Sequence, residues 1–256
     1  MQEVENVFEN AYYRTKCIKG LFVHDISNLF QIISNSIELC ETLFSEEAKK
    51  EVITKYFQMI SQQLTRGKKL IRNVRSLSDL DEYKMPLEPV EVLSMLRSVV
   101  DFTRNNFPKR DIDIKVISEY GSLYAMVNEL LREVFENIIM NSINYTKNKV
   151  VRIEVKISKI DFHYRDYVKM EFKDNGIGID DARKLSIFQK VHPKHRRSRG
   201  MGIGLSLVAK LIELYEGEIW VENRIKGDST KGSNFIILIP LTKQKQRKEM
   251  LNDKLS

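Results

Sequence analysis

The first third of the chain has the apolar spacing of long α-helices. Between about residue 4 and residue 79 there is no proline, glycine occurs only at Gly20 and Gly67, and apolar residues recur three and four positions apart. The pattern predicts two helices that join near residues 44–46. Their apolar stripes comprise Ile18, Phe22, Leu29, Ile32, Leu39 and Leu43 in the first helix, and Ile53, Phe57, Ile60, Leu64, Ile71 and Val74 in the second. Because a two-helix hairpin cannot bury stripes this wide, we expect two copies to form a four-helix bundle in a homodimer.

After the helical region, the segment DLDEYKMPLEP interrupts the pattern with an acidic run and two prolines. We therefore predict a helical hairpin over 1–80, a linker over 81–86, a second domain over 87–241 and a charged tail over 242–256.

Helical and strand patterns alternate in the second domain. We predict helices at 92–105, 123–145, 180–188 and 203–215, and strands at 112–117, 150–157, 167–173, 218–223 and 234–240. The expected fold class is therefore α+β: the hairpin is followed by an α/β sandwich whose mixed sheet carries helices on one face.

Composition narrows the class of protein. The 256 residues are 42% apolar and 30% charged, as in folded globular chains. The formal net charge is +7, but Lys and Arg are spread along the chain except at 194–199 and 243–248, and no nucleic-acid-reading motif is present, so we do not expect nucleic-acid binding. Neither a signal peptide nor an apolar run of about 20 residues occurs, which argues against a transmembrane segment in this chain. A membrane sensor would belong to a longer parent protein or to another chain.

The two cysteines indicate a reducing compartment. Cys17 and Cys40 lie in the same predicted helix, 23 positions apart, or about 35 Å at the helical rise. They cannot bridge each other in one straight helix, and no metal-ligand spacing surrounds them. We therefore expect a cytoplasmic location.

Three motifs in the second domain point to a nucleotide. ENIIMNSINYT begins at Glu136, DNGIGI at Asp174 and GMGIGL at Gly200. The last motif includes Gly202 and Gly204 and lies where a loop meets a helix, so that backbone N–H groups can hold phosphate oxygens. By itself, such a glycine triplet is equally well a plain turn.

The other two motifs supply complementary chemistry. Asn137 and Asn141 lie one turn apart on a helix, and their amide oxygens suit Mg²⁺, although isolated asparagines are often only helix-surface amides. Asp174 ends a strand and can accept a hydrogen bond from an adenine amino group. Gly176 and Gly178 let the backbone approach a flat ligand. In GSNF, Ser233 can support Asp174 through its hydroxyl group or a water molecule.

The basic segment KVHPKHRRSR lies between the DNGIGI turn and the glycine triplet. It is short and has little periodicity, which fits either a flexible lid or a solvated charge run. Cations beside a triphosphate would offset its charge. The candidate cations are Lys194, Arg196, Arg197 and Arg199.

These motifs together resemble the GHKL ATPase superfamily, specifically the catalytic ATP-binding domain of sensor histidine kinases. ENIIMNSINYT is similar to the N box, DNGIGI to the first glycine box, IFQKV to a weakened F box and GMGIGLSLVAKLIELYEG to the second glycine box. The resemblance implies ATP and Mg²⁺ as ligands. It implies that Asn141 is the metal ligand, Asn137 a secondary one and Asp174 the adenine anchor, and that Tyr145, Gly176, Gly178, Gly200, Gly202 and Gly204 contribute to nucleotide binding.

Two positions depart from the family pattern. Asn144 stands where a lysine often precedes Tyr145, so a phosphate contact is either missing or supplied by the cations of the basic segment. Val191 replaces the second aromatic residue of the F box. We expect weaker or differently gated nucleotide closure, with binding retained.

The first predicted helix distinguishes among the superfamily members. FVHDISNLFQ resembles the H box of a dimerisation and histidine-phosphotransfer domain, with His24 and Asn28 on one helix face. A neutral imidazole can attack phosphorus when a neighbour, here Asp25, holds its other nitrogen. The resemblance implies that Asn28 orients a water molecule for regulator dephosphorylation. His163, His192 and His195 fit this role less well.

The sequence therefore predicts a homodimeric histidine kinase core that phosphorylates His24 from Mg·ATP and passes the phosphoryl group to an aspartate of a response-regulator receiver domain. Two alternatives stay open. One is a mechanical GHKL ATPase that does not retain phosphate on the protein, and the other is a phosphotransfer scaffold with a decayed nucleotide site.

Overall fold

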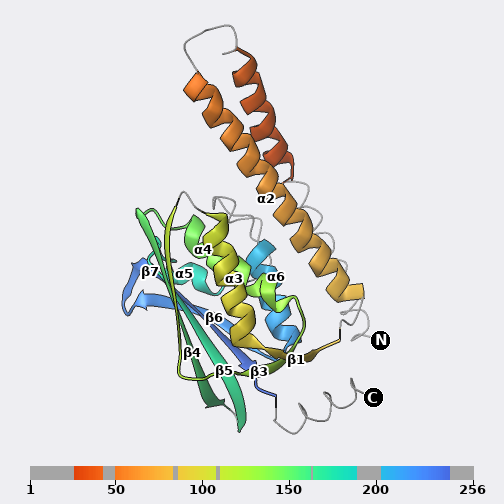
Figure 1. Ribbon diagram of the computed structural model, residues 1–256, viewed down its shortest axis with the longest axis vertical. Coiled ribbons are helices and arrows are strands. Elements are labelled where there is room, and N and C mark those ends of the chain that lie inside the picture. The colour runs from red at the N-terminus through yellow and green to blue at the C-terminus, as the bar shows by residue number, and fades with distance from the viewer. Residues whose placement is uncertain are drawn as a thin grey trace. The chain divides into compact units, whose positions relative to one another are not determined.

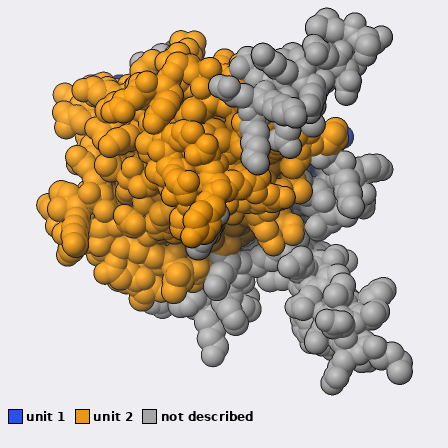
Figure 2. Space-filling model, turned by 90° about the horizontal axis from the view of Figure 1, so that it is seen from below, with its two compact units in different colours: residues 1–82, 197–203 blue, residues 83–196, 204–256 orange. Residues whose placement is uncertain are grey.

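A computed structural model describes residues 26–42, 50–82, 86–107, 110–162, 164–188 and 203–242. The chain divides into two compact units (Figure 2). Unit 1 comprises residues 1–82 and 197–203, and unit 2 comprises residues 83–196 and 204–256. No helix in the described part of the chain is both long and apolar enough to cross a membrane.

Unit 1 contains a helical hairpin, as predicted (Figure 1). A helix over 26–42 lies beside α2 (Lys50–Glu82), which continues past the predicted end of the hairpin at residue 80. The helices bury Leu29 and Cys40 from the first helix and Leu70 from α2. At Gly67, an added Cβ would lie 3.5 Å from Leu29 Cδ1, an ordinary van der Waals distance, so the side chain of Leu29 faces α2 at this position. The predicted helical residues before residue 26 and the predicted join near residues 44–46 lie outside the described residues.

Unit 2 is built on a five-stranded sheet with the order β2-β4-β5-β7-β6. The strands are β2 (Asp111–Ser118), β4 (Val150–Phe162), β5 (Arg165–Asp174), β6 (Glu218–Ile225) and β7 (Asp228–Pro240). β2 and β4 are parallel and the other neighbours are antiparallel, so the sheet is mixed, as predicted. The register places Val155, Phe172 and Phe235 side by side across three strands. Because side chains alternate along a strand, these buried residues define one apolar face.

Three helices cover this face (Figure 1): α3 (Val92–Asn106), α4 (Leu131–Asn144) and α6 (Ile203–Leu214). The ring of Phe135 in α4 packs against Phe172 with 6.1 Å between the ring centroids. Glu91 caps α3 by accepting hydrogen bonds from the backbone N–H groups of Leu93 and Ser94. The expectation of helices on one face of a mixed sheet is therefore confirmed.

The prediction of one continuous helix over 123–145 is wrong in its first part. Residues Tyr124–Val127 form β3, which pairs antiparallel with β1 (Glu88–Glu91) in a second, two-stranded sheet that the sequence analysis missed. Leu, Ala and Met favour helices, but burial alternates along this stretch, with Ala125 and Val127 fully buried. The Asn128 side chain then accepts a hydrogen bond from the Leu130 N–H group, in a turn that precedes α4.

Two other boundaries also differ from the prediction. The helix expected at 180–188 is only the short α5 (Asp181–Lys184), whose N-cap is Asp180. β7 begins at Asp228, six positions before the predicted start, because Asp228 and Ser233, at the two ends of the polar stretch DSTKGS, pair with β6. Gly227, with φ of 84°, supplies the turn between these two strands.

Candidate functional site

The Asp174 carboxylate forms the centre of the site. It lies at the end of β5, is only 3% exposed, and is surrounded by donors from three segments. One oxygen, Oδ1, accepts hydrogen bonds from the N–H groups of Gly176 at 2.8 Å and Ser233 at 3.2 Å. The other, Oδ2, accepts from the hydroxyl group of Ser233 at 2.5 Å and lies 3.4 Å from the Ser142 hydroxyl oxygen, whose single proton is shared with the Ile138 carbonyl oxygen at 3.2 Å. The fold thus fixes the orientation of this acceptor before any ligand binds.

The DNGIGI turn fits closely between α4 and the β6–β7 hairpin. The Ile177 N–H group donates to the carbonyl oxygen of Tyr145, the C-cap residue of α4, at 3.1 Å. A Cβ at Gly176 would lie 3.1 Å from the same oxygen. Gly178 has φ of 71°, and a Cβ there would overlap the carbonyl group of Ser229. Gly178 is therefore required for two reasons: its φ is positive, and the hairpin backbone leaves no room for a Cβ.

Replacing Gly178 with Ala should both strain the backbone and force the turn away from the hairpin. We expect a loss of roughly 2 kcal/mol or more of unfolding free energy and weaker ATP binding, measured by thermal unfolding and by nucleotide titration. Gly227→Ala is the matched control, since Gly227 also has positive φ but a Cβ there meets nothing within 4 Å. Equal behaviour of the two variants would contradict the proposed close packing.

Helix α4 presents the two asparagines of the predicted metal site. Asn137 is 3% exposed, and its Nδ2 donates to the Glu133 carbonyl oxygen at 2.8 Å. This bond uses the amide nitrogen and leaves the amide oxygen as an acceptor. Asn141 follows one turn later and is half-buried. Two neutral oxygen donors on one helix face fit a Mg²⁺ ion that retains most of its water ligands and also binds phosphate oxygens.

The structure adds three residues that the sequence analysis did not select. Ser142 contributes the second hydroxyl group near Asp174. Gly232 has φ of 101°, and a Cβ there would overlap the carbonyl oxygen of Asp174. The Asn175 side chain accepts from the Arg152 N–H group at 2.8 Å and donates to the Val150 carbonyl oxygen at 3.0 Å, which fastens the turn to β4. For Ser142, the position next to Asn141 was the available signal. For Asn175 and Gly232, the contacts arise only where segments distant in the chain meet.

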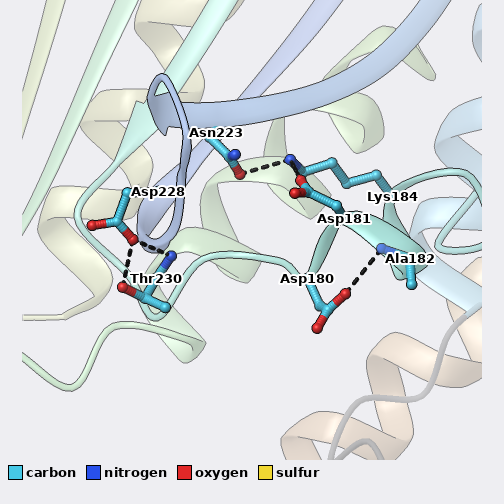
Figure 3. Close-up of polar contacts among 7 residues, drawn as sticks. All are labelled: Asp180, Asp181, Ala182, Lys184, Asn223, Asp228 and Thr230. Carbon is cyan, nitrogen blue, oxygen red and sulfur yellow. Dashed lines mark hydrogen bonds and ion pairs between the residues drawn. The ribbon is translucent and has the colours of Figure 1, made fainter.

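The segment after the turn is anchored to β6 (Figure 3). Lys184 of α5 donates to Asn223 Oδ1 at 2.6 Å and pairs with Asp181, whose pKa is lowered by the hydrogen bond and charge of that lysine. Beside it, the Asp228 carboxylate accepts from the Thr230 hydroxyl group at 2.6 Å and from the Thr230 N–H group at 2.9 Å, and these bonds lower its pKa. α5 and the β6–β7 hairpin therefore frame the turn through polar contacts.

Two further contacts support the site. Phe188, the first aromatic residue of the predicted F box, packs edge-on against Phe235 with 6.1 Å between centroids. At the far end of α6, the Tyr215 hydroxyl group donates to Asn128 Oδ1 at 2.6 Å, and burial raises the pKa of Tyr215. The second contact connects the end of α6 with the turn that precedes α4.

The remaining predicted site residues are distributed as follows. Tyr145 is partly exposed at the end of α4, Gly204 is half-buried near the start of α6, and Asn28 is exposed on the helix over 26–42. The other predicted residues lie outside the described residues: His24, Asp25, Val191, Lys194, Arg196, Arg197, Arg199, Gly200 and Gly202. The same is true of His163, His192 and His195.

The fold and this site define an ATP-binding domain, and comparison with known proteins supports that class. Residues 126–243 match the sequence profile of the family described as histidine kinase-, DNA gyrase B- and HSP90-like ATPase. Phytochrome-like protein Cph1 of Synechocystis sp. is 28% identical over 226 residues, which cover 85% of this chain and 28% of Cph1. Adaptive-response sensory kinase SasA of Synechocystis sp. is 24% identical over 249 residues, covering 94% of this chain and 62% of SasA. The chain thus spans less than two thirds of either relative.

Solved structures agree with this relationship. The catalytic domain of histidine kinase ThkA is 25% identical, has a TM-score of 0.52 and covers 62% of this chain and 100% of that chain. Histidine kinase ThkA in complex with response regulator protein TrrA has a TM-score of 0.64 at 22% identity, covers 94% of this chain and 64% of that chain, and shows a similar fold across both units. The chain is therefore similar to the sensor histidine kinases: residues 126–243 match their ATPase domain, and a helical hairpin precedes it. That ATPase domain implies ATP binding.

Proposed function

We propose that this chain is the kinase core of a two-component signalling system. It binds Mg·ATP in unit 2, transfers the γ-phosphoryl group to His24, and then donates that group to an aspartate of a response-regulator receiver domain. The observation that carries the proposal is the buried Asp174 carboxylate, which three hydrogen bonds from Gly176 and Ser233 orient at the end of β5 inside an ATPase domain. A fixed acceptor of this kind suits the amino group of adenine.

Each part of the nucleotide would contact a different element. Asp174 accepts from the adenine amino group, supported by Ser233, while Gly176 and Gly178 keep the turn close to the ring. Tyr145 lies beside the base at the end of α4. Asn141, with Asn137 as a secondary ligand, holds Mg²⁺, which offsets the charge of the phosphates. Gly200, Gly202 and Gly204 cradle the phosphates, and Lys194, Arg196, Arg197 and Arg199 supply the cations that the asparagine at position 144 does not.

The transfer step needs positioning and charge compensation more than covalent help. An unprotonated ring nitrogen of His24 attacks the γ-phosphorus, and a new N–P bond forms. The bond between the γ-phosphorus and the bridging oxygen breaks, and ADP leaves with the electron pair. Asp25 accepts the hydrogen bond from the other ring nitrogen and stabilises the positive ring that results.

Asn28 is proposed to act only in dephosphorylation of the regulator, by orienting the water that attacks the aspartyl phosphate and releases inorganic phosphate. Its position supports this role, since it lies on the same helix face as His24 in the sequence pattern and is exposed on the helix over 26–42. We expect Asn28→Ala to retain autophosphorylation and to slow regulator dephosphorylation about tenfold or more. Both rates should be followed with a purified receiver domain. An equal loss of both activities would identify Asn28 as a structural residue.

Dimerisation through unit 1 is proposed from an apolar row that one hairpin leaves exposed. On α2, Phe57, Leu64 and Ile71 are seven residues apart and are 53%, 52% and 54% exposed. Phe30 and Ile37 repeat this spacing on the first helix and are 64% and 44% exposed. A seven-residue apolar repeat is the pattern by which helices pack against each other in bundles. The matching surface of a second copy is therefore the proposed partner for these residues.

Leu64→Glu should weaken the dimer at least about tenfold, because each dimer loses two buried leucines and gains two charges in an apolar contact. Sedimentation equilibrium measures the change. Gln62→Glu adds the same charge to the other side of α2, at an exposed position, and should leave the dimer intact. If both variants associate as the unchanged chain does, the dimer does not use this row.

The decisive functional test is whether phosphate stays on the protein. Incubation with γ-labelled ATP should give label that is stable in alkali and lost in acid, as expected for a phosphohistidine. ATP turnover without retained label would instead support a mechanical ATPase. Failure to bind ATP in a direct titration would support a phosphotransfer scaffold.

A further inference from the structure

A cavity of about 330 Å³ lies where the DNGIGI turn meets the β6–β7 hairpin. Three of the residues that line it are cations: Lys147 from the loop after α4, Arg224 from β6 and Lys231 from β7. The remaining lining residues are Asn148, Asn175, Gly176, Ile177, Ile225 and Thr230. Asp174, Ser233 and the two asparagines of α4 are not among them, so this cavity adjoins the proposed adenine site through Gly176 but does not include the adenine anchor or the metal contacts.

The polar walls of the cavity are held in place by the fold. Asn148 Nδ2 donates to the carbonyl oxygen of Asn175 at 2.7 Å, and the Asn175 side chain is fastened to the start of β4. On the hairpin side, Thr230 is bonded to Asp228 through both its hydroxyl and N–H groups, and Figure 3 shows this contact at the hairpin. The stem of Arg224 lies over Gly232, since a Cβ there would be 3.2 Å from Arg224 Cδ. A ligand would meet a preformed frame.

The charged residues that line the cavity are all positive. None of the described residues that line it is acidic, and none of its three cations forms a salt bridge with another described residue. The nearby carboxylate of Asp228 attracts Lys231, but it lies outside the lining and is already engaged by Thr230. Three like charges around one small cavity favour an anion that can neutralise them.

We propose that this cavity binds a small phosphate monoester. A guanidinium group and two ammonium groups are the side chains that bind phosphate oxygens, the guanidinium through paired hydrogen bonds. The volume is at the lower end of the range for small-molecule sites, which suits a compact ligand. Ile177 and Ile225 add apolar walls that an ester group can contact and that inorganic phosphate cannot use. The site does not depend on ATP binding and goes beyond the proposed kinase function.

The test is a titration of the full chain, in Mg²⁺-free buffer, with glycerol 3-phosphate and separately with inorganic phosphate. The δ1 methyl signals of Ile177 and Ile225 report on the cavity, and those of Ile117 and Ile160 serve as references on the sheet. We expect saturable shifts of Ile177 and Ile225 with a Kd of about 1 mM or below, with the ester binding more tightly than the inorganic ion. Equal affinities would overturn the ester assignment, and no saturable shift would overturn the site.

Charge variants assign the signal to this cavity. Arg224→Gln combined with Lys231→Gln should weaken binding at least about tenfold, and Lys147→Gln provides an independent variant outside the hairpin. Lys226→Gln removes a charge from the same hairpin at a residue that does not line the cavity, and should have little effect. Equal weakening by Lys226→Gln would overturn the proposal in favour of a general charge effect. The methyl shift of Ile225 reports ligand binding at the hairpin directly. The affinities of these variants can therefore be compared even if unit 2 fails to bind ATP.

Discussion

Replacing His24 with Gln is expected to abolish protein labelling from γ-labelled ATP, to at least about a thousandfold below the unchanged chain, because no other group is proposed to act as the nucleophile. Glutamine keeps the size and polarity of the side chain but has no nucleophilic ring nitrogen. ATP affinity should stay within about twofold of the starting value, because His24 does not belong to the nucleotide site. Labelling and nucleotide titration on the same preparation check both parts.

Asn141→Asp is the matching variant in the other unit. It should also remove labelling, but for a different reason. The substitution replaces the proposed metal ligand on α4, so Mg²⁺-dependent nucleotide binding should become weaker. Loss of label with intact binding in His24→Gln, and loss of both in Asn141→Asp, separates the acceptor from the nucleotide site. Persistent labelling of His24→Gln would show that another residue accepts the phosphoryl group.

Asp174→Asn is expected to reduce ATP affinity roughly a hundredfold, because hydrogen bonds to a charged group contribute about 1.5–3 kcal/mol each. Asparagine has almost the same shape, but its amide nitrogen is a donor. In the place of Oδ2, this nitrogen would face the Ser233 and Ser142 hydroxyl groups. In the place of Oδ1, it would face the N–H groups of Gly176 and Ser233. The variant should also lose its preference for ATP over inosine triphosphate, whose base lacks the amino group. Calorimetric titration with both nucleotides measures this difference.

Asp166→Asn is the control for that experiment. Asp166 lies on the same strand, but it is exposed and paired with Lys159 at 2.8 Å, so the same substitution should leave nucleotide affinity unchanged. Surface ion pairs of this kind contribute little to stability. If Asp174→Asn binds ATP as well as Asp166→Asn does, Asp174 is not the adenine anchor.

The sequence predicted the site correctly where the residue type and its local spacing indicate the same role. Asp174 ends a strand and is followed by glycines, and the structure places Ser233 on its carboxylate as the sequence suggested. The hairpin and the mixed sheet followed from helical and alternating periodicity. These features depend on local pattern, which a single sequence carries.

Other features depend on partners that are distant in the chain. Tyr124–Val127 reads as the start of a helix because Ala and Met favour that state, and only pairing with β1 makes it a strand. From the local sequence, Gly232 is expected just before a strand. Its positive φ and its contact with Asp174 arise from the packing of β7 against β5. The cationic cavity likewise requires three separate segments to meet.

We propose above that the γ-phosphoryl group of ATP is transferred to His24. The most direct test of this transfer is mass-spectrometric mapping of the chain after incubation with Mg·ATP, under neutral to alkaline conditions that preserve phosphohistidine. Tryptic cleavage after Lys19 leaves His24 on a peptide that contains none of the other three histidines. We expect phosphate on that peptide, at His24. Phosphate found only at His163, His192 or His195, or no retained phosphate while ATP is hydrolysed, would contradict the proposal.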